Sequence, residues 1–295
     1  MSTQVDTALV NQYRSNIEIQ FQQKGSRLRR AVRNESQNGE YAYYDRIGPT
    51  SPSEITTRHA DTVLVDTPHT RRRVALKDYV WADMIDDQDK IRMLADPTSS
   101  YVMNAVHSFG RQMDDDILAA AVGNAYSGKA GGTTVALPAG QHIEVNLPTG
   151  ADRKLTIEKL MRARRILDDA EALEEGENAF IAVTPQQIES LLSATEVTSI
   201  DYNTVRALVN GDINSFMGFE FIRLSSARMT TDANSDQQII AWARNGLLLA
   251  SAMDIKVNVT DRADKNHNMQ VHVKASFGAT RLWDEKVTEI ACDTA

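Results

Sequence analysis

The sequence predicts an α+β fold, on three observations. Apolar side chains recur every three or four positions from about residue 97 to about residue 126, which indicates one long amphipathic helix. Apolar and polar residues alternate strictly over 255–259 and 269–275, which indicates a hairpin with one solvated face. Short strand and helix patterns follow one another between 155 and 242. A chain with this mixture is neither all-helical nor all-β.

The chain begins with a polar arm and a long excursion. The first 36 residues are too polar to form a core alone, and five basic residues without an acidic one lie between 20 and 34, so we expect this arm to gain order on another surface. Residues 40–47, 63–65 and 74–80 are rich in β-formers, with prolines between them. They predict a long two-stranded excursion with a polar tip, which needs a partner surface because isolated hairpins are marginal in water.

The long helix follows. Asp96 is a good N-cap and Pro97 fits the first helical position. A helix from there to about residue 126 would be about 45 Å long. Gly110 in its middle is a predicted bend point, and the glycine-rich loop 127–134 ends it.

The remaining chain predicts a mixed body. Thr156 caps a helix that runs to about residue 173 and stops at Gly176. A buried strand over 180–183 precedes a helix that Pro185 opens. Further strands are expected over 219–224 and 238–242.

Composition limits the class of function. The chain has 295 residues and a net charge of −8, which argues against a dedicated nucleic-acid binder. The single cysteine, Cys292, excludes an internal disulfide and any cysteine-based zinc site. Neither an apolar run of about 18 residues nor a secretory signal is found. We therefore expect a soluble protein in a reducing cytoplasm, with no membrane partner.

No stretch of the sequence predicts catalysis. The loop 127–134 lacks the spacing of a phosphate-binding loop, and neither a nucleophile elbow nor a zinc-binding helix motif is present. Residues 114–116 are three aspartates, but consecutive helical side chains point about 100° apart, so a solvated face is a better interpretation than a metal site. Residues 71–73 are three arginines, of which at most two share a face of a strand; salt bridges between subunits are at least as good an interpretation as nucleic-acid binding. We predict no enzyme, no metal and no cofactor.

The order of these elements resembles that of the major capsid proteins of tailed bacteriophages, which share the Hong Kong ninety-seven fold. Within 210–226, Gly211, Ile213, Gly218, Phe219 and Ser225 match the family's turn-plus-strand pattern. The closing segment is similar to the family's ending, with Gly278, Arg281 and a last strand over 287–290.

The resemblance implies a domain layout with the following ranges. We expect 1–37 as the N-terminal arm, 38–85 as the extended E-loop hairpin, 86–150 as the P-domain with the long spine helix, 151–252 as the mixed α/β A-domain, 253–284 as the P-domain β-hairpin and 285–295 as the terminal strand that returns to the A-domain. No helical segment of about a hundred residues precedes the arm, so we expect a separate scaffolding protein.

The resemblance also implies a function and its partners. It implies a structural protein that assembles with itself, as hexamers and pentamers, into an icosahedral shell around packaged double-stranded DNA, bound without sequence specificity. Scaffolding protein, a portal and a decoration or cement protein are the other expected partners, and the location is the virion, assembled in the bacterial host cytoplasm. An encapsulin-like nanocompartment shell is the nearest alternative, and an unrelated enzyme or binding protein is a more distant one.

Four sets of residues follow as candidate sites. The expected E-loop contacts between subunits are Tyr41, Tyr43, Arg71, Arg72 and Arg73. The expected acidic counter-surfaces are Asp114, Asp115, Asp168, Asp169, Glu174 and Glu175. The expected arm contacts are Arg27, Arg29 and Arg30. The expected structural turn contains Gly211 and Gly218.

Overall fold

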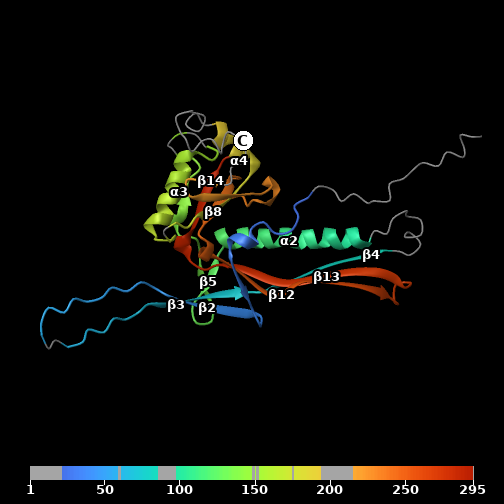
Figure 1. The fold of residues 1–295 in the computed structure, drawn as a ribbon, viewed down its shortest axis with the longest axis horizontal. Helices are drawn as coiled ribbons and strands as arrows, with labels where there is room; N and C mark the ends of the chain where they lie inside the picture. The colour runs from blue at the N-terminus through green and yellow to red at the C-terminus, as the bar shows by residue number, and fades with distance from the viewer. Residues whose placement is uncertain are drawn as a thin grey trace, which may run out of the picture. The chain divides into compact units, whose positions relative to one another are not determined.

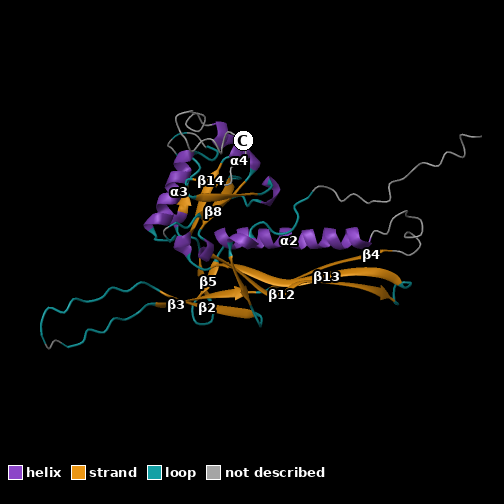
Figure 2. Cartoon of the chain, in the orientation of Figure 1, coloured by secondary structure: helices purple, strands orange, loops and turns teal. Residues whose placement is uncertain are grey.

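The computed structural model describes residues 22–58, 61–85, 98–147, 150, 153–174, 176–193 and 215–294. The chain divides into two compact units. The first contains Met1–Ser26, Asp78–Arg111 and Met253–Ser276, and the second contains Arg27–Lys77, Gln112–Ala252 and Phe277–Ala295. Figure 2 shows that helices and strands both contribute, which confirms the α+β class.

The first unit combines part of one helix with part of one sheet. The helix is α2 (Thr98–Val122), and the strands are β4 (Lys77–Ile85), β12 (Leu247–Arg262) and β13 (Asn268–Arg281). These strands, with β1 (Arg33–Ser36) of the second unit, form a sheet in the order β1-β12-β13-β4. Within β13, Val271, Val273 and Ala275 are buried while His272 and Lys274 between them are only half-buried, as the sequence pattern predicts for a sheet with one covered face; beyond Ala275 the strand is buried almost throughout.

The second unit contains a six-stranded sheet, which holds its largest buried side chain, Trp242. The strand order is β7-β14-β11-β8-β10-β9. The bounds are β7 His142–Ile143, β8 Ala179–Val183, β9 Ser215–Phe216, β10 Phe219–Arg223, β11 Gln237–Trp242 and β14 Val287–Cys292. Two helices accompany it, α3 (Ile157–Asp169) and α4 (Pro185–Ser193). Thr156 accepts a hydrogen bond from the backbone N–H of Lys159, as a helix N-cap does.

A second sheet of this unit forms the base of the excursion. Its order is β2-β3-β5-β6, with β2 Tyr41–Ile47, β3 His69–Ala75, β5 Ala125–Ser127 and β6 Thr133–Val135. Between β2 and β3, the described residues 48–58 and 61–68 run out and back without regular structure (Figure 1). The strand expected over 63–65 is therefore wrong. Val63 and Leu64 are 68% and 90% exposed, because no described strand lies beside them to complete a ladder.

The long helix also ends earlier than expected. It stops at Val122, because Ala125–Ser127 leaves the helix to pair with β3 and β6. The predicted cap at Asp96 and Pro97 lies outside the described residues. A short 3-10 helix at Arg29–Ala31 precedes β1, and others connect described strands, at Ala139–Gln141, Ser226–Arg228, Arg244–Gly246 and Asp284–Lys286.

Gly110, the predicted bend point, also lets another stretch of backbone approach the helix closely. A Cβ atom there would lie 2.5 Å from the Cα atom of Gly25 and 2.7 Å from the backbone nitrogen of Ser26, so the arm crosses α2 at this position. The crossing is fastened by Gln22, whose side chain donates to Asn104 and accepts from Arg111. Only glycine lets two backbones approach this closely.

Candidate assembly surfaces

The three consecutive arginines of β3 point to opposite faces of their sheet. Arg71 and Arg73 share one face with Tyr41 and Tyr43 of β2, because strand side chains alternate. Arg72 lies on the other face and is only 1% exposed. Its expected contact with a neighbouring subunit is therefore wrong, since its own subunit already encloses it.

Arg72 belongs to a buried charge cluster. Its Nη2 atom donates to Asp284, and Arg281 donates from Nε to the other oxygen of the same carboxylate at 2.6 Å. Arg281 also donates to the carbonyls of Ala121, Gly123 and Val135 at 2.7–3.1 Å. Burial lowers the pKa of Arg72, and the charge of Asp284 opposes this shift. The carboxylate of Asp284 thus connects β3, through Arg72, with β6 and the end of α2, through Arg281.

The opposite face of this sheet carries what we call the arginine–tyrosine surface: Tyr41, Tyr43, Arg71, Arg73 and Tyr126. The three tyrosines are 41–44% exposed. The guanidinium carbon of Arg73 lies 4.9 Å from the ring centre of Tyr41 and 4.7 Å from that of Tyr126. Both distances fall within the range of cation–π attraction. The sequence pattern predicts Tyr126 at the end of the long helix, whereas the pairing of β5 with β3 brings it to this surface.

Arg71 is satisfied within this surface. It donates to Asp45 at 2.5 Å and lies 5.7 Å from the ring of Tyr43. The hydrogen bond from Arg71 holds the pKa of Asp45 below its ordinary value. The pKa of Tyr41 is raised, above all by its hydrogen bond with Glu40. The inter-subunit roles of Tyr41, Tyr43 and Arg71 remain predictions.

The three aspartates of α2 do not form the expected solvated face. Asp114 is 1% exposed and accepts hydrogen bonds from the backbone N–H groups of Arg27 and Leu28 at 3.0 and 3.1 Å. Asp115 pairs with Arg228, and Asp116 pairs with Lys77. The three carboxylates diverge, as helical geometry requires, but each finds a partner in its own subunit. An inter-subunit contact by the enclosed Asp114 is therefore wrong, while that of Asp115 stays a prediction.

Burial raises the pKa of Asp115, and the charge and hydrogen bond of Arg228 act in the opposite direction. The pair is half-buried, so the ion pair with Arg228 offsets a real desolvation cost.

Among the described residues, no group of three or more His, Cys, Asp or Glu could hold a metal ion.

The basic arm makes further contacts with its own subunit from Arg27 onward. Arg27 donates to the carbonyl of Arg223 at 2.5 Å, and Arg30 pairs with Glu220 at 3.0 Å. The indole of Trp242 donates to the carbonyl of Ala31 at 2.9 Å. Arg29 lies in the 3-10 helix between these contacts. The arm then pairs as β1, in parallel, with Leu248–Ser251 of β12.

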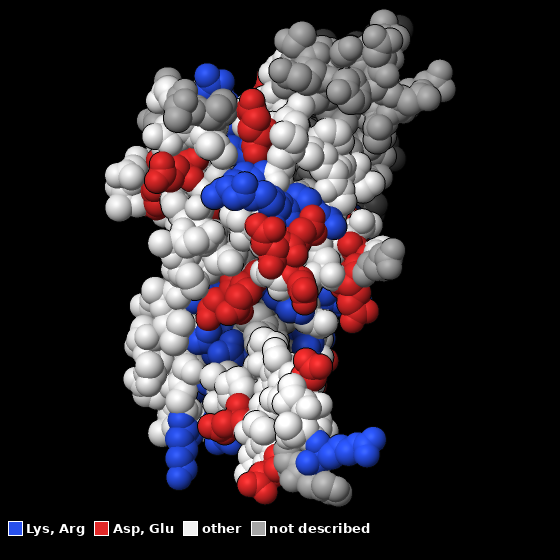
Figure 3. All heavy atoms as spheres, turned by 90° about the vertical axis from the view of Figure 1, so that its left-hand side faces the viewer, with Lys and Arg blue, Asp and Glu red and all other residues white. Residues whose placement is uncertain are grey.

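The acidic run after residue 167 divides into two parts. Asp168 and Asp169 pair with Arg164 and Arg165 one turn earlier in α3, at 2.9 and 3.7 Å. Figure 3 shows acidic side chains beside basic ones on the face it views. Beyond the helix, Glu171 and Glu174 are exposed, and neither has an ion pair within the part of the chain that is described. Glu175 lies outside the described residues.

Gly218 lies in the turn between β9 and β10. Its φ of +77° falls in the left-handed region, and it follows Met217, which has a φ of +53°. A Cβ atom at Gly218 would also meet the guanidinium of Arg164. Gly211 lies outside the described residues.

His142 stands near the edge of the six-stranded sheet. Its Nδ1 atom lies 3.5 Å from the carboxylate of Glu289. The hydrogen bond with Glu289 raises the pKa of His142, against a smaller opposing effect of burial.

None of the helices in the described part of the chain has the length and apolar character of a membrane span.

Comparison with known proteins places this fold. A family model for phage capsid proteins matches residues 5–294. The capsid of Ralstonia phage GP4 superposes with a TM-score of 0.75 at 10% identity, over 97% of this chain and 96% of that chain. The Cyanophage Pam1 capsid gives 0.73 at 12% identity, over 100% and 98%, and the capsid of Cyanophage P-SCSP1u gives 0.70 at 15%, over 100% and 96%. No curated protein sequence matches the chain.

These findings confirm the Hong Kong ninety-seven type of α+β fold that the resemblance implies, because the likeness covers nearly the whole of each chain. The matching family is one of structural capsid proteins and not of enzymes. With the family model matched from residue 5 to residue 294, the chain belongs to the phage capsid protein family.

Proposed function

We propose that the chain is the main shell subunit of a phage head, and that copies assemble as hexamers and pentamers into an icosahedral shell around double-stranded DNA. Membership of the phage capsid family over residues 5–294 is the observation on which this depends. Encapsulin-like shells share the same general fold, but the matching family favours the phage head.

The excursion between β2 and β3 supports assembly with other copies. Ile55 is 84% exposed and Leu64 is 90% exposed, on a segment that makes no regular structure of its own. Fully burying one such side chain stabilises a protein by about 1.5–3 kcal/mol. Ordering the excursion therefore becomes favourable when a second subunit covers these side chains.

We assign the expected parts as follows. Residues 38–85 act as the E-loop over a neighbouring subunit, α2 acts as the spine helix, and the β12–β13 hairpin belongs to the P-domain. A scaffolding protein and a portal are the assembly partners in the host cytoplasm, and a decoration protein binds the outside. The net charge of −8 suits a wall that encloses DNA without binding its sequence.

Electron microscopy and light scattering of the purified chain test this proposal, with and without its scaffolding protein. Closed shells of uniform diameter are the expected result. A chain that stays monomeric under every condition, including co-expression with the scaffolding protein, would contradict it. Shells that capture a dedicated protein cargo and contain no portal would favour the encapsulin alternative.

A further inference from the structure

We propose that Arg73 of the arginine–tyrosine surface binds carboxylates of a second copy of this chain, supplied by Glu171 and Glu174 of the turn after α3. The inference rests on the proposed shell function and names a partner surface within it. Each copy would then present both surfaces, one to each of two neighbours, which is the arrangement of a ring.

The structure holds Arg73 in place before any partner arrives. Its guanidinium lies between the rings of Tyr41 and Tyr126. Its aliphatic stem is covered by Gly131, where a Cβ atom would lie 2.5 Å from the Cδ atom of Arg73 and where φ is +65°. The loop that contains Gly131 is fastened in turn by the hydroxyl of Tyr43, which donates to the carbonyl of Ala130. A side chain so restrained loses little entropy on binding.

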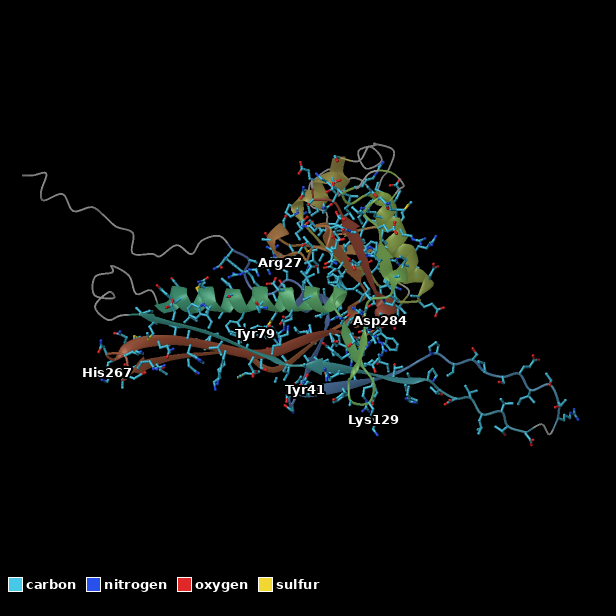
Figure 4. The ribbon with its side chains drawn as sticks, turned by 180° about the vertical axis from the view of Figure 1, so that it is seen from behind. Arg27, Tyr41, Tyr79, Lys129, His267 and Asp284 are labelled. Atoms are coloured by element: carbon cyan, nitrogen blue, oxygen red, sulfur yellow. The ribbon has the colours of Figure 1, made fainter. Side chains whose placement is uncertain are left out.

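The charge of Arg73 is not neutralised within the described part of its subunit. Arg71, two residues away on the same face, pairs with Asp45, and Arg72 on the other face pairs with Asp284. Arg73 makes no ion pair with any described residue, and its Nε atom is enclosed without an acceptor. Lys129, on the loop that also contains Gly131, is exposed, and Figure 4 shows it close to the strand of Tyr41. A carboxylate is the partner that a planar guanidinium binds best.

Hydrogen bonds hold the backbone of the turn after α3, from which the carboxylates of Glu171 and Glu174 extend. The backbone N–H groups of Glu171 and Ala172 donate to Asp168 and Leu167, and that of Glu177 donates to the carbonyl of Glu174. Ala172 is buried, which fixes the middle of the turn. Glu171 and Glu174 project into solvent, unlike Asp168 and Asp169, whose charges are met by arginines of their own helix.

A second copy is favoured over other occupants on two grounds. The two surfaces belong to different sheets of one unit, since α3 packs on β7 and β14 while Arg73 lies on β3. Arg73 has no acidic partner among the described residues, and Glu171 and Glu174 have no basic partner among them. The chain as a whole is acidic, which disfavours the alternative that Arg73 binds the phosphates of nucleic acid.

Charge exchange between the two surfaces tests the inference in the full-length chain. Arg73→Glu and the double variant Glu171→Lys with Glu174→Lys are each expected to reduce the yield of shells, and combining all three changes is expected to restore it, because every copy then carries a complementary pair. Arg73→Gln should raise the concentration for half-maximal assembly by about two- to fivefold. Arg262→Gln, which removes an exposed internal pair with Asp264 and lies outside both surfaces, is the matched control and should not be rescued by the lysine variants.

The outcomes separate the hypotheses. Circular dichroism of the unassembled subunit shows whether each variant folds. If Arg73→Glu fails to fold, normal assembly of the exposed double lysine variant overturns the inference, and impaired assembly that added salt relieves supports it. Disrupted shells without rescue overturn it. If Arg73→Glu assembles empty shells normally but its filled particles retain less DNA, the inference is overturned in favour of phosphate binding. A wild-type chain that forms no shells under any condition overturns the proposed function as well.

Discussion

Asp284 is expected to matter far more to folding than Arg72, one of the two arginines it binds. Replacing it by Asn leaves Arg72 and Arg281 buried without a counter-charge, and breaking a buried pair in this way costs about 3–5 kcal/mol. Arg72→Met leaves the carboxylate with Arg281 and removes two enclosed nitrogens, Nε and Nη1, that lack acceptors. A swap of similar volume then costs about 1.5 kcal/mol or less.

Urea and thermal unfolding of the unassembled subunit measure this difference. At about 2–4 °C per kcal/mol, Asp284→Asn should lower the melting temperature by on the order of 10 °C, and Arg72→Met by only a few degrees. Arg71→Met, which removes an exposed pair, is a control expected within about 0.5 kcal/mol of wild type. A larger loss for Arg72→Met than for Asp284→Asn would refute the reasoning, because it would mean that Arg72 is the main stabilising member of the cluster.

Three further predictions concern other parts of the subunit. Deleting residues 1–36 removes Leu28, Ala31 and Val32, which are fully buried, and should destabilise the unassembled subunit by several kcal/mol, at about 1.5–3 kcal/mol per large side chain. Deleting residues 1–21 leaves these side chains in place and is the control. Equal melting temperatures for the two deletions would contradict the prediction. Gly218→Ala should cost about 1–2 kcal/mol in urea unfolding through its positive φ, against almost nothing for Gly140→Ala, where a Cβ atom meets open space. Because the pKa of His142 is raised on folding, its pair with Glu289 stabilises the subunit below pH about 6.5 and loses this effect as pH rises through the folded pKa. The stability of His142→Gln should therefore vary less with pH over this window than that of wild type. A variant with the same pH profile as wild type would show that this pair does not cause the pH dependence.

Local patterns predicted the regular elements well. The alternation that leads into β13 and the capping Thr156 of α3 are properties of short stretches, and packing reinforced both. The strand over 63–65 failed because β-propensity alone does not supply a neighbouring strand. Tyr126 was misplaced because its pairing partner, Arg73, lies more than fifty residues away in the sequence.

Charged residues were the least predictable from the sequence. The alternation of strand side chains limits the three arginines to two on one face, but it does not say that Arg72 would meet Asp284 from the far end of the chain. The three aspartates of α2 were expected in solvent because they are consecutive and acidic. Asp114 is buried instead, because the backbone N–H groups of Arg27 and Leu28 in the arm donate hydrogen bonds to its carboxylate. Such partners come from tertiary topology, which no local window contains.

The hydrogen bonds of Arg281 have a mechanical consequence. Its guanidinium holds the carbonyls of Ala121 and Gly123 at the end of α2, while the carboxylate it shares also holds Arg72 at the root of the excursion. A force applied to the excursion by another subunit would therefore act on this carboxylate through Arg72. Strain delivered to an exposed loop would thus have a side-chain route to the end of a long helix, in addition to the backbone pairing of β3 with β5.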